Sequence, residues 1–235
     1  MPTDRPDHFA LFTATAGVLA AVAGYVNAVT IVGALHVPST HMSGTATRLS
    51  IDLVTQSDPS ALVRDGALLG AFIFGAALSG AVLESTQLRI GRRYGGLLVI
   101  ESLLLTGAWL LFSTAWYHLP LIALAAGLQN ALATQYSRAT VRTTHVTGIL
   151  TDLGIALGKW VARRGVTAWR VVLYLVILGG FFAGGAAGAA LSLLIGRHAL
   201  LIPIAVTGIG GALYWLWQYR FVRDASRNLL TLGRR

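Results

Sequence analysis

The chain carries the same polar signature twice, each time inside or beside a long apolar segment. The first copy reads Gly-Tyr-Val-Asn-Ala at residues 24–28 and Thr-His-Met-Ser-Gly at 40–44. The second reads Gly-Leu-Gln-Asn-Ala at 127–131 and Thr-His-Val-Thr-Gly at 144–148, an offset of 103 residues for the first block and 104 for the second. Polar groups cost free energy in lipid, so a duplicated polar set there is a functional candidate. The repeat predicts a chain of two related halves.

The composition is typical of a membrane protein. Of the 235 residues, 55% are hydrophobic and 11% are charged, whereas a soluble chain carries about 25% charged residues. A helix that crosses lipid needs roughly 17–25 apolar residues. We therefore predict an all-α polytopic membrane protein with one membrane domain, in contact with the lipid bilayer. Its six predicted spans are Phe9–Leu35, Ala61–Leu83, Gly95–Ser113, Leu119–Tyr136, Val171–Ile195 and Ala199–Phe221.

Two further apolar stretches, Thr40–Leu53 and Thr144–Trp160, are shorter and each follows the first helix of its half. Basic residues gather on the cytoplasmic side of a membrane, and this rule favours six crossings over eight. With six crossings and a cytoplasmic N-terminus, only Arg48, Arg64 and Arg197 of the 18 Lys and Arg residues fall outside. Both termini are then cytoplasmic, and the two short stretches are broken or re-entrant helices.

Three crossings per half is an odd number, so the second half enters the membrane from the opposite side. The first repeat spans residues 9–113 and the second spans 119–221, followed by a basic cytoplasmic tail at 222–235. Many secondary transporters are built from such inverted repeats, with the binding site near the midplane where interrupted helices meet. The sequence therefore predicts two inverted three-helix repeats.

The repeated Ser/Thr-Gly pairs stand where each short apolar stretch begins. Gly44 and Gly148 are predicted to lie at helix N-termini whose free N–H groups face an anion or polar substrate. The alternative is that Ser43 and Thr147 are simple N-caps. His41 and His145 either share a proton or bind one substrate from two sides, or they are structural. A metal site has no third ligand at suitable spacing.

The amide side chains Asn27, Gln129 and Asn130 lie within apolar runs. Such side chains either line a cavity or hydrogen-bond neighbouring helices together. We take the repeated polar residues together as one candidate substrate-binding site. This predicted site comprises Asn27, Thr40, His41, Ser43, Gly44, Gln129, Asn130, Thr144, His145, Thr147 and Gly148.

Three charged residues are further candidates. Arg48 and Asp152 are matched by the 104-residue offset and carry opposite charges, so they form either a charge pair at the pseudo-twofold axis or two separately solvated groups. Glu101 lies inside the third span without a counterpart in the other half, and a carboxylate there is a candidate proton relay because it is costly in lipid. Small residues recur every fourth position around Gly75 and Gly184, which predicts close helix packing within the bundle or across a homodimer.

Other functional classes find no support in the sequence. The chain has no Cys and contains no nucleotide-binding glycine motif and no hydrolase or metalloprotease motif. We expect neither an enzyme nor a cofactor. The net charge of +9 follows from membrane topology, because no basic-aromatic nucleic-acid module accompanies it.

At these signatures the chain resembles the YoaK-like family of bacterial six-helix integral membrane proteins, a family of unknown function. The similar segments are Ala23–Val29, Ser39–Gly44, Ala126–Ala131 and Val141–Thr151, and the resemblance extends over nearly the whole chain. Family members often have Asn after the Thr-Gly of the first signature, where this chain has Thr45. The resemblance implies a protein of the bacterial cytoplasmic membrane.

The function that these features favour is a transporter or channel for a small polar or anionic solute, with a central site built from both signatures. The alternative is a membrane protein that acts in assembly or signalling, in which the signatures only pack helices. A water-accessible cavity lined by both signatures favours the first function, and a dry core favours the second.

Overall fold

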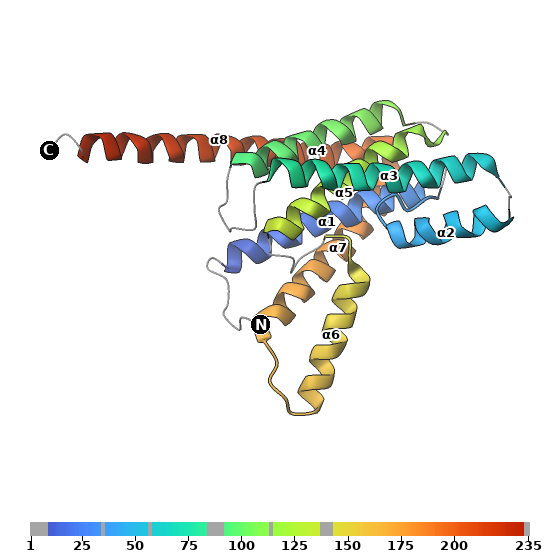
Figure 1. The fold of residues 1–235 in the computed structure, drawn as a ribbon, viewed down its shortest axis with the longest axis horizontal. Coiled ribbons are helices and arrows are strands. Elements are labelled where there is room, and N and C mark those ends of the chain that lie inside the picture. The colour runs from blue at the N-terminus through green and yellow to red at the C-terminus, as the bar shows by residue number, and fades with distance from the viewer. Residues whose placement is uncertain are drawn as a thin grey trace.

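The computed structural model describes residues 9–33, 36–55, 58–83, 92–112, 115–136 and 143–232, and these ranges contain helices and their connections but no strand (Figure 1). This agrees with the predicted all-α class. The elements are α1 Phe9–Val32, α2 Met42–Thr55, α3 Pro59–Val82, α4 Arg92–Leu110, η1 Trp116–His118, α5 Leu119–Tyr136, α6 Val146–Val161, α7 Ala168–Ile195, η2 Gly196–Leu200 and α8 Leu201–Leu232.

Each of the six predicted spans coincides with one long helix, and the two short stretches form α2 and α6. Among the residues that the structure describes, three segments are long and apolar enough to cross a membrane: α1, α3, and the continuous run Ala168–Arg220 through α7 and α8. At 1.5 Å per residue, the 24 residues of α1 reach about 36 Å, which exceeds the hydrocarbon thickness of a bilayer. The helices α4 and α5 have 19 and 18 residues. The predicted tail is not separate, because α8 runs on to Leu232.

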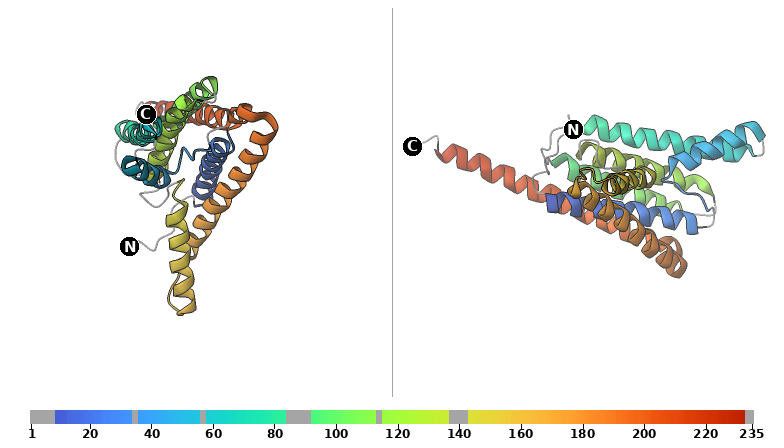
Figure 2. Two further views of the ribbon diagram at one scale, coloured as in Figure 1. Left: turned by 90° about the vertical axis from the view of Figure 1, so that its right-hand side faces the viewer. Right: turned by 90° about the horizontal axis from the view of Figure 1, so that it is seen from below.

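Helices of the two halves pack crosswise (Figures 1 and 2). Helix α1 lies along α7, α3 lies along α5, and α4 lies along α8, so that each pair joins one helix from each half. The short helix α2 packs on α3, and α6 packs on α7. The core of the molecule therefore lies between the halves rather than within either one.

Glycines permit the crosswise packing. A Cβ added at Gly24 would overlap the carbonyl oxygen of Phe181, and one at Gly184 would overlap that of Ala21. In the α3–α5 pair the same overlaps recur, between Gly127 and Phe72 and between Gly75 and Leu124. Gly75 and Gly184 are 109 residues apart, as are Phe72 and Phe181. The small-residue spacing therefore serves contacts within this chain, the first of the two alternatives.

Helix α3 begins with a complete N-cap. The Asp58 carboxylate accepts hydrogen bonds from the backbone N–H of Ser60 at 2.8 Å and from its hydroxyl at 2.9 Å, and Pro59 occupies the first helical position. These hydrogen bonds lower the pKa of the Asp58 carboxyl. The cap and the proline together define the first turn of α3.

The two short helices differ in their placement. Helix α2 runs beside α3, whereas α6 diverges from the bundle and protrudes from it (Figure 2). Large apolar side chains on α6 are correspondingly exposed, among them Leu157, Trp160 and Val161. The two halves are thus related in their long helices and differ at the short one.

Candidate functional site

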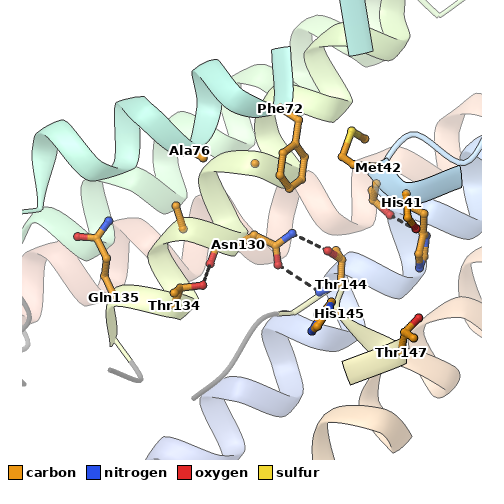
Figure 3. A pocket seen from close by; sticks show the side chains of 14 residues that line it. His41, Met42, Phe72, Ala76, Asn130, Thr134, Gln135, Thr144, His145 and Thr147 are labelled. Carbon is orange, nitrogen blue, oxygen red and sulfur yellow. Dashed lines mark hydrogen bonds between the residues drawn. The ribbon is translucent and has the colours of Figure 1, made fainter. Parts of the chain in front are cut away.

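One cavity of about 550 Å³ brings the two signatures together (Figure 3). The segments before and at the start of α2 and α6 form one side, and α3 and α5 form the other. No Asp, Glu, Lys or Arg side chain lines it within the described ranges. Its lining comprises Thr40, His41, Met42, Ser43, Phe72, Ala76, Gly127, Asn130, Ala131, Thr134, Gln135, Thr144, His145 and Thr147.

In the first half, an asparagine on α1 holds the segment that leads into α2. The Thr40 hydroxyl donates a hydrogen bond to Asn27 Oδ1 at 2.8 Å, and both side chains are buried. Asn27 itself does not line the cavity. Its amide satisfies the threonine and thereby places Thr40 and His41 at the cavity wall.

In the second half, an asparagine on α5 holds the corresponding segment before α6. Asn130 Oδ1 accepts hydrogen bonds from the Thr143 hydroxyl at 3.0 Å and from the Thr144 backbone N–H at 3.2 Å. Asn130 Nδ2 donates to the Thr144 hydroxyl at 2.5 Å (Figure 3). The Asn–Thr spacing shared by both copies therefore has one structural purpose, which is to fix the start of each short helix against the preceding long one.

The two histidines reach the same cavity from the two short helices. His41 is half-buried, and its ring meets the edge of the Phe181 ring at a centroid distance of 5.7 Å. His145 is exposed, and its ring lies over Gly148, where any Cβ would overlap it. Gly148 therefore makes room for His145. Gly44 has open space at the equivalent point and neither glycine lines the cavity.

The N-termini of α2 and α6 supply the polarity of the cavity. Their first helical backbone bonds are donated by Thr45 to His41 and by Ile149 to His145. The N–H groups of residues 42–44 and 146–148 precede these donors and have no carbonyl partner within their own helix. His145 is the N-cap of α6 and makes no side-chain cap bond, so Thr147 is not a cap. Two positive helix ends thus border the cavity, an environment that favours anions and other hydrogen-bond acceptors.

Gln129 lies behind the cavity wall and joins it to a buried carboxylate. Gln129 Nε2 donates to Glu101 Oε1 at 3.1 Å, and Gln129 Oε1 accepts from the Thr143 hydroxyl at 3.2 Å. Glu101 is 3% exposed, and its Oε2 has no hydrogen-bond partner among the residues that the structure describes. A continuous hydrogen-bonded path therefore leads from α4 through α5 to the start of α6.

In the structure Arg48 does not pair with Asp152, the first of the two alternatives that the sequence left open. Arg48 Nε bonds to Asp65 Oδ2 at 2.9 Å, while Arg64 Nε bonds to Asp65 Oδ1 at 2.8 Å. Asp152 is instead hydrogen-bonded to the Tyr174 hydroxyl. Each short helix packs on the long helix that follows it in the same half, α2 on α3 and α6 on α7. Its charged side chain therefore meets that helix and not the axis between the halves.

Several residues of this region escaped sequence reasoning. Asp65 and Tyr174 are 109 residues apart, the offset that relates α3 to α7, but they differ in type, so no repeated charge marked them as partners of Arg48 and Asp152. Thr134 lies one turn after Asn130 on α5 and therefore shares its face. Phe72, on α3, carried no polar signal of its own.

The fold and the site define the class of protein: an all-helical membrane protein with a cavity that both polar and apolar residues line. Residues 15–213 match the family model described as a protein of unknown function (DUF1275), and the chain belongs to that family. It is 34% identical over 104 residues to a UPF0700 transmembrane protein of Rhizobium meliloti (strain 1021). That match covers 43% of this chain and 45% of the relative, so it spans less than half of the curated relative's length. No solved structure matches the chain.

Proposed function

We propose that this protein is a transporter or channel for a small polar or anionic solute. The observation that carries the proposal is a cavity of about 550 Å³ that is lined by residues of both signatures. Its volume falls in the range of small-molecule sites, roughly 300–1,000 Å³. Its lining combines two histidines, hydroxyl and amide groups and two helix N-termini, which together suit a solute that accepts hydrogen bonds. A protein in which the signatures only packed helices would not need this space.

We further propose six membrane crossings in two inverted repeats. The crosswise packing supports this, because α1 on α7 and α5 on α3 are the same contact seen from the two halves, with matching glycines. Inverted repeats place a binding site at their interface, which is where the cavity lies. We also propose that the protein belongs with the YoaK-like family, that it lies in the bacterial cytoplasmic membrane, and that both termini are cytoplasmic. A homodimer would need surfaces other than the glycine faces already used within the chain.

A solute-uptake screen in proteoliposomes tests the proposed transport. Ala76 lines the cavity, and the neighbouring Ala77 is exposed on the other side of α3. A solute carried by the wild type should be excluded by Ala76→Phe, because the ring fills the cavity, and should still enter with Ala77→Phe. Equal uptake by both variants, or no solute carried by the wild type across the screen, would favour the assembly or signalling alternative.

A further inference from the structure

The surroundings of Glu101 are those of a functional residue rather than a structural one. It lies on α4 with 3% of its surface exposed, and Gln129 is the donor to its Oε1. Its Oε2 has no hydrogen-bond partner among the described residues. A buried carboxylate that only held helices together would normally have both oxygens satisfied. Ionisable residues inside membrane helices are costly and mark sites of function.

A small void of about 10 Å³ lies beside Glu101. Apolar side chains of α1, α4 and α5 line it, together with Thr40 and Gln129, and Glu101 is its one titratable group in the described part of the chain. Helix α8 meets α4 one residue further on, through Ser102 and the Ile204 carbonyl, with no titratable group at that contact. A void of this size is about that of one water.

The void and the cavity share a wall. Thr40 lines both, and the adjacent His41 is the next titratable side chain on that segment. The Thr40 hydroxyl donates its hydrogen bond to Asn27, and its oxygen can accept a hydrogen bond from a water in either space. Because Thr40 is the wall common to both spaces, a proton that enters the cavity has one residue to pass before it reaches the void at Glu101.

The second route from Glu101 leads to α6. Gln129 bonds to Glu101 with its amide nitrogen and to Thr143 with its amide oxygen, and Thr143 also bonds to Asn130. These bonds hold the segment from which α6 begins. A charged carboxylate accepts a hydrogen bond about twice as strongly as a neutral group does. The strength with which Gln129 holds the segment before α6 therefore depends on whether Glu101 is charged.

We propose that Glu101 is the proton-binding residue of this carrier and that its proton controls how firmly the start of α6 is held at the cavity. The inference rests on the proposed function for the meaning of the cavity. A hydronium ion in the cavity gives a proton to Oε2: one O–H bond of the hydronium breaks, one forms on the carboxylate, and the products are water and the neutral acid. The acid holds Gln129 more weakly, which loosens Thr143 and the first turn of α6.

The first test uses the proton as the only ligand, with purified full-length protein in lipid vesicles. Infrared difference spectra between acid and alkaline buffer should show one buried carboxylic acid C=O band, and Glu101→Gln should remove it. The control Asp58→Asn, at an exposed cap that asparagine also supports, should keep it. A band that persists in Glu101→Gln would overturn the assignment.

The second test measures the link to α6 by hydrogen exchange of residues 143–149, corrected for the intrinsic effect of pH. In the wild type, exchange at acid pH should be about fivefold faster than at alkaline pH, the effect of one weakened hydrogen bond. Glu101→Gln should exchange fast at both, because an amide imitates the neutral acid. If that variant does not fold, Gln129→Leu should keep the infrared band and lose the pH dependence of exchange.

Wild-type exchange that is independent of pH, or a pH dependence that survives in both variants, would overturn the link. Neither measurement involves a solute. A failed uptake screen with both proton results positive would leave Glu101 as a proton site in a protein that is not a carrier. The reverse combination would leave a carrier without this coupling.

Discussion

Asn27 and Asn130 show what the repeated amides do at the scale of single residues. Asn27 accepts a hydrogen bond from the Thr40 hydroxyl, and Asn130 accepts one from the Thr144 backbone N–H and donates one to the Thr144 hydroxyl. Each of these threonines precedes a short helix and is followed by a histidine, whose place the asparagine therefore fixes. The histidines are then free to face the cavity. In each signature, the Asn and Thr residues position the segment, and the histidine, His41 or His145, lines the cavity.

We predict that His41→Ala and His145→Ala each reduce uptake in proteoliposomes about fivefold, the effect of one lost hydrogen bond of about 1 kcal/mol. Both side chains line one cavity, so the double variant should lose less than the sum of the two losses in free energy. Thermal melting in detergent should stay near that of the wild type. Variants that melt early, with full activity in the surviving protein, would make the histidines structural.

We also predict that Asp65→Asn destabilises the protein by about 2 kcal/mol, because it removes a fully buried carboxylate that two arginines share. The loss should lie below that of a wholly buried pair, since the Arg48 side chain is 33% exposed. Thermal melting and limited proteolysis of α2 measure it. Asp152→Asn, on the exposed short helix of the other half, should melt close to the wild type.

The sequence predicted much of the site at this scale and missed its supports. The 103- and 104-residue offsets were enough to pair the histidines and the asparagines. Asp65 has no acidic counterpart, because the matched residue is Tyr174, so no repeated charge revealed it. Glu101 was recognised as a buried carboxylate, but its contact with Gln129 depends on how α4 meets α5, which no local pattern encodes.

At the scale of helices, glycine positions decide which helices meet. Gly75 lies where α3 touches the backbone of α5, whereas Gly80 on the same helix has open space around it. Gly75 and Gly80 lie on the same helix and differ in packing, so a substitution at Gly80 is a matched control for one at Gly75. The same contrast recurs on α7 between Gly184 and Gly179.

We predict that Gly75→Ala destabilises the protein by about 1–3 kcal/mol, because the new methyl group meets the Leu124 carbonyl and the two backbones must separate. Gly80→Ala should be neutral or stabilise by up to about 1 kcal/mol through helix propensity. Melting temperatures of the two variants in one detergent make the comparison. Equal destabilisation of both would contradict the close α3–α5 contact.

The sequence predicted the existence and limits of the helices well, because long apolar runs bounded by polar turns determine them. The predicted span Leu119–Tyr136 has the limits of α5, and four others agree within a few residues; the sixth, Ala199–Phe221, ends 11 residues before α8 does at Leu232. The divergence of α6 from α7 was not predicted. A short helix makes few contacts with its neighbour, and α6 makes few with α7. The apolar pattern of α6 is similar to that of a packed helix, so the pattern did not indicate the divergence.

At the scale of the whole molecule, the arrangement in the membrane gives a direct test. A reporter fused after Arg93 should read cytoplasmic and one at Trp116 should read external, because the basic residues gather on the inner side. A fusion at the C-terminus should read cytoplasmic. The reverse pair, or an external C-terminus, would end the proposal of inverted repeats.

The crosswise packing also sets an order of events during synthesis. Helix α1 ends at Val32, and the helix that fills its glycine groove begins only at Ala168. The ribosome must therefore deliver most of the chain before α1 can meet its final neighbour, and until then a groove lined by Gly17, Gly24 and Ala21 stands open to lipid or to the insertion machinery. A nascent chain stalled after α4 would hold four helices and almost none of its native contacts between helix pairs. Each half is therefore the folding partner of the other, because neither half holds the helices that its own glycine faces contact.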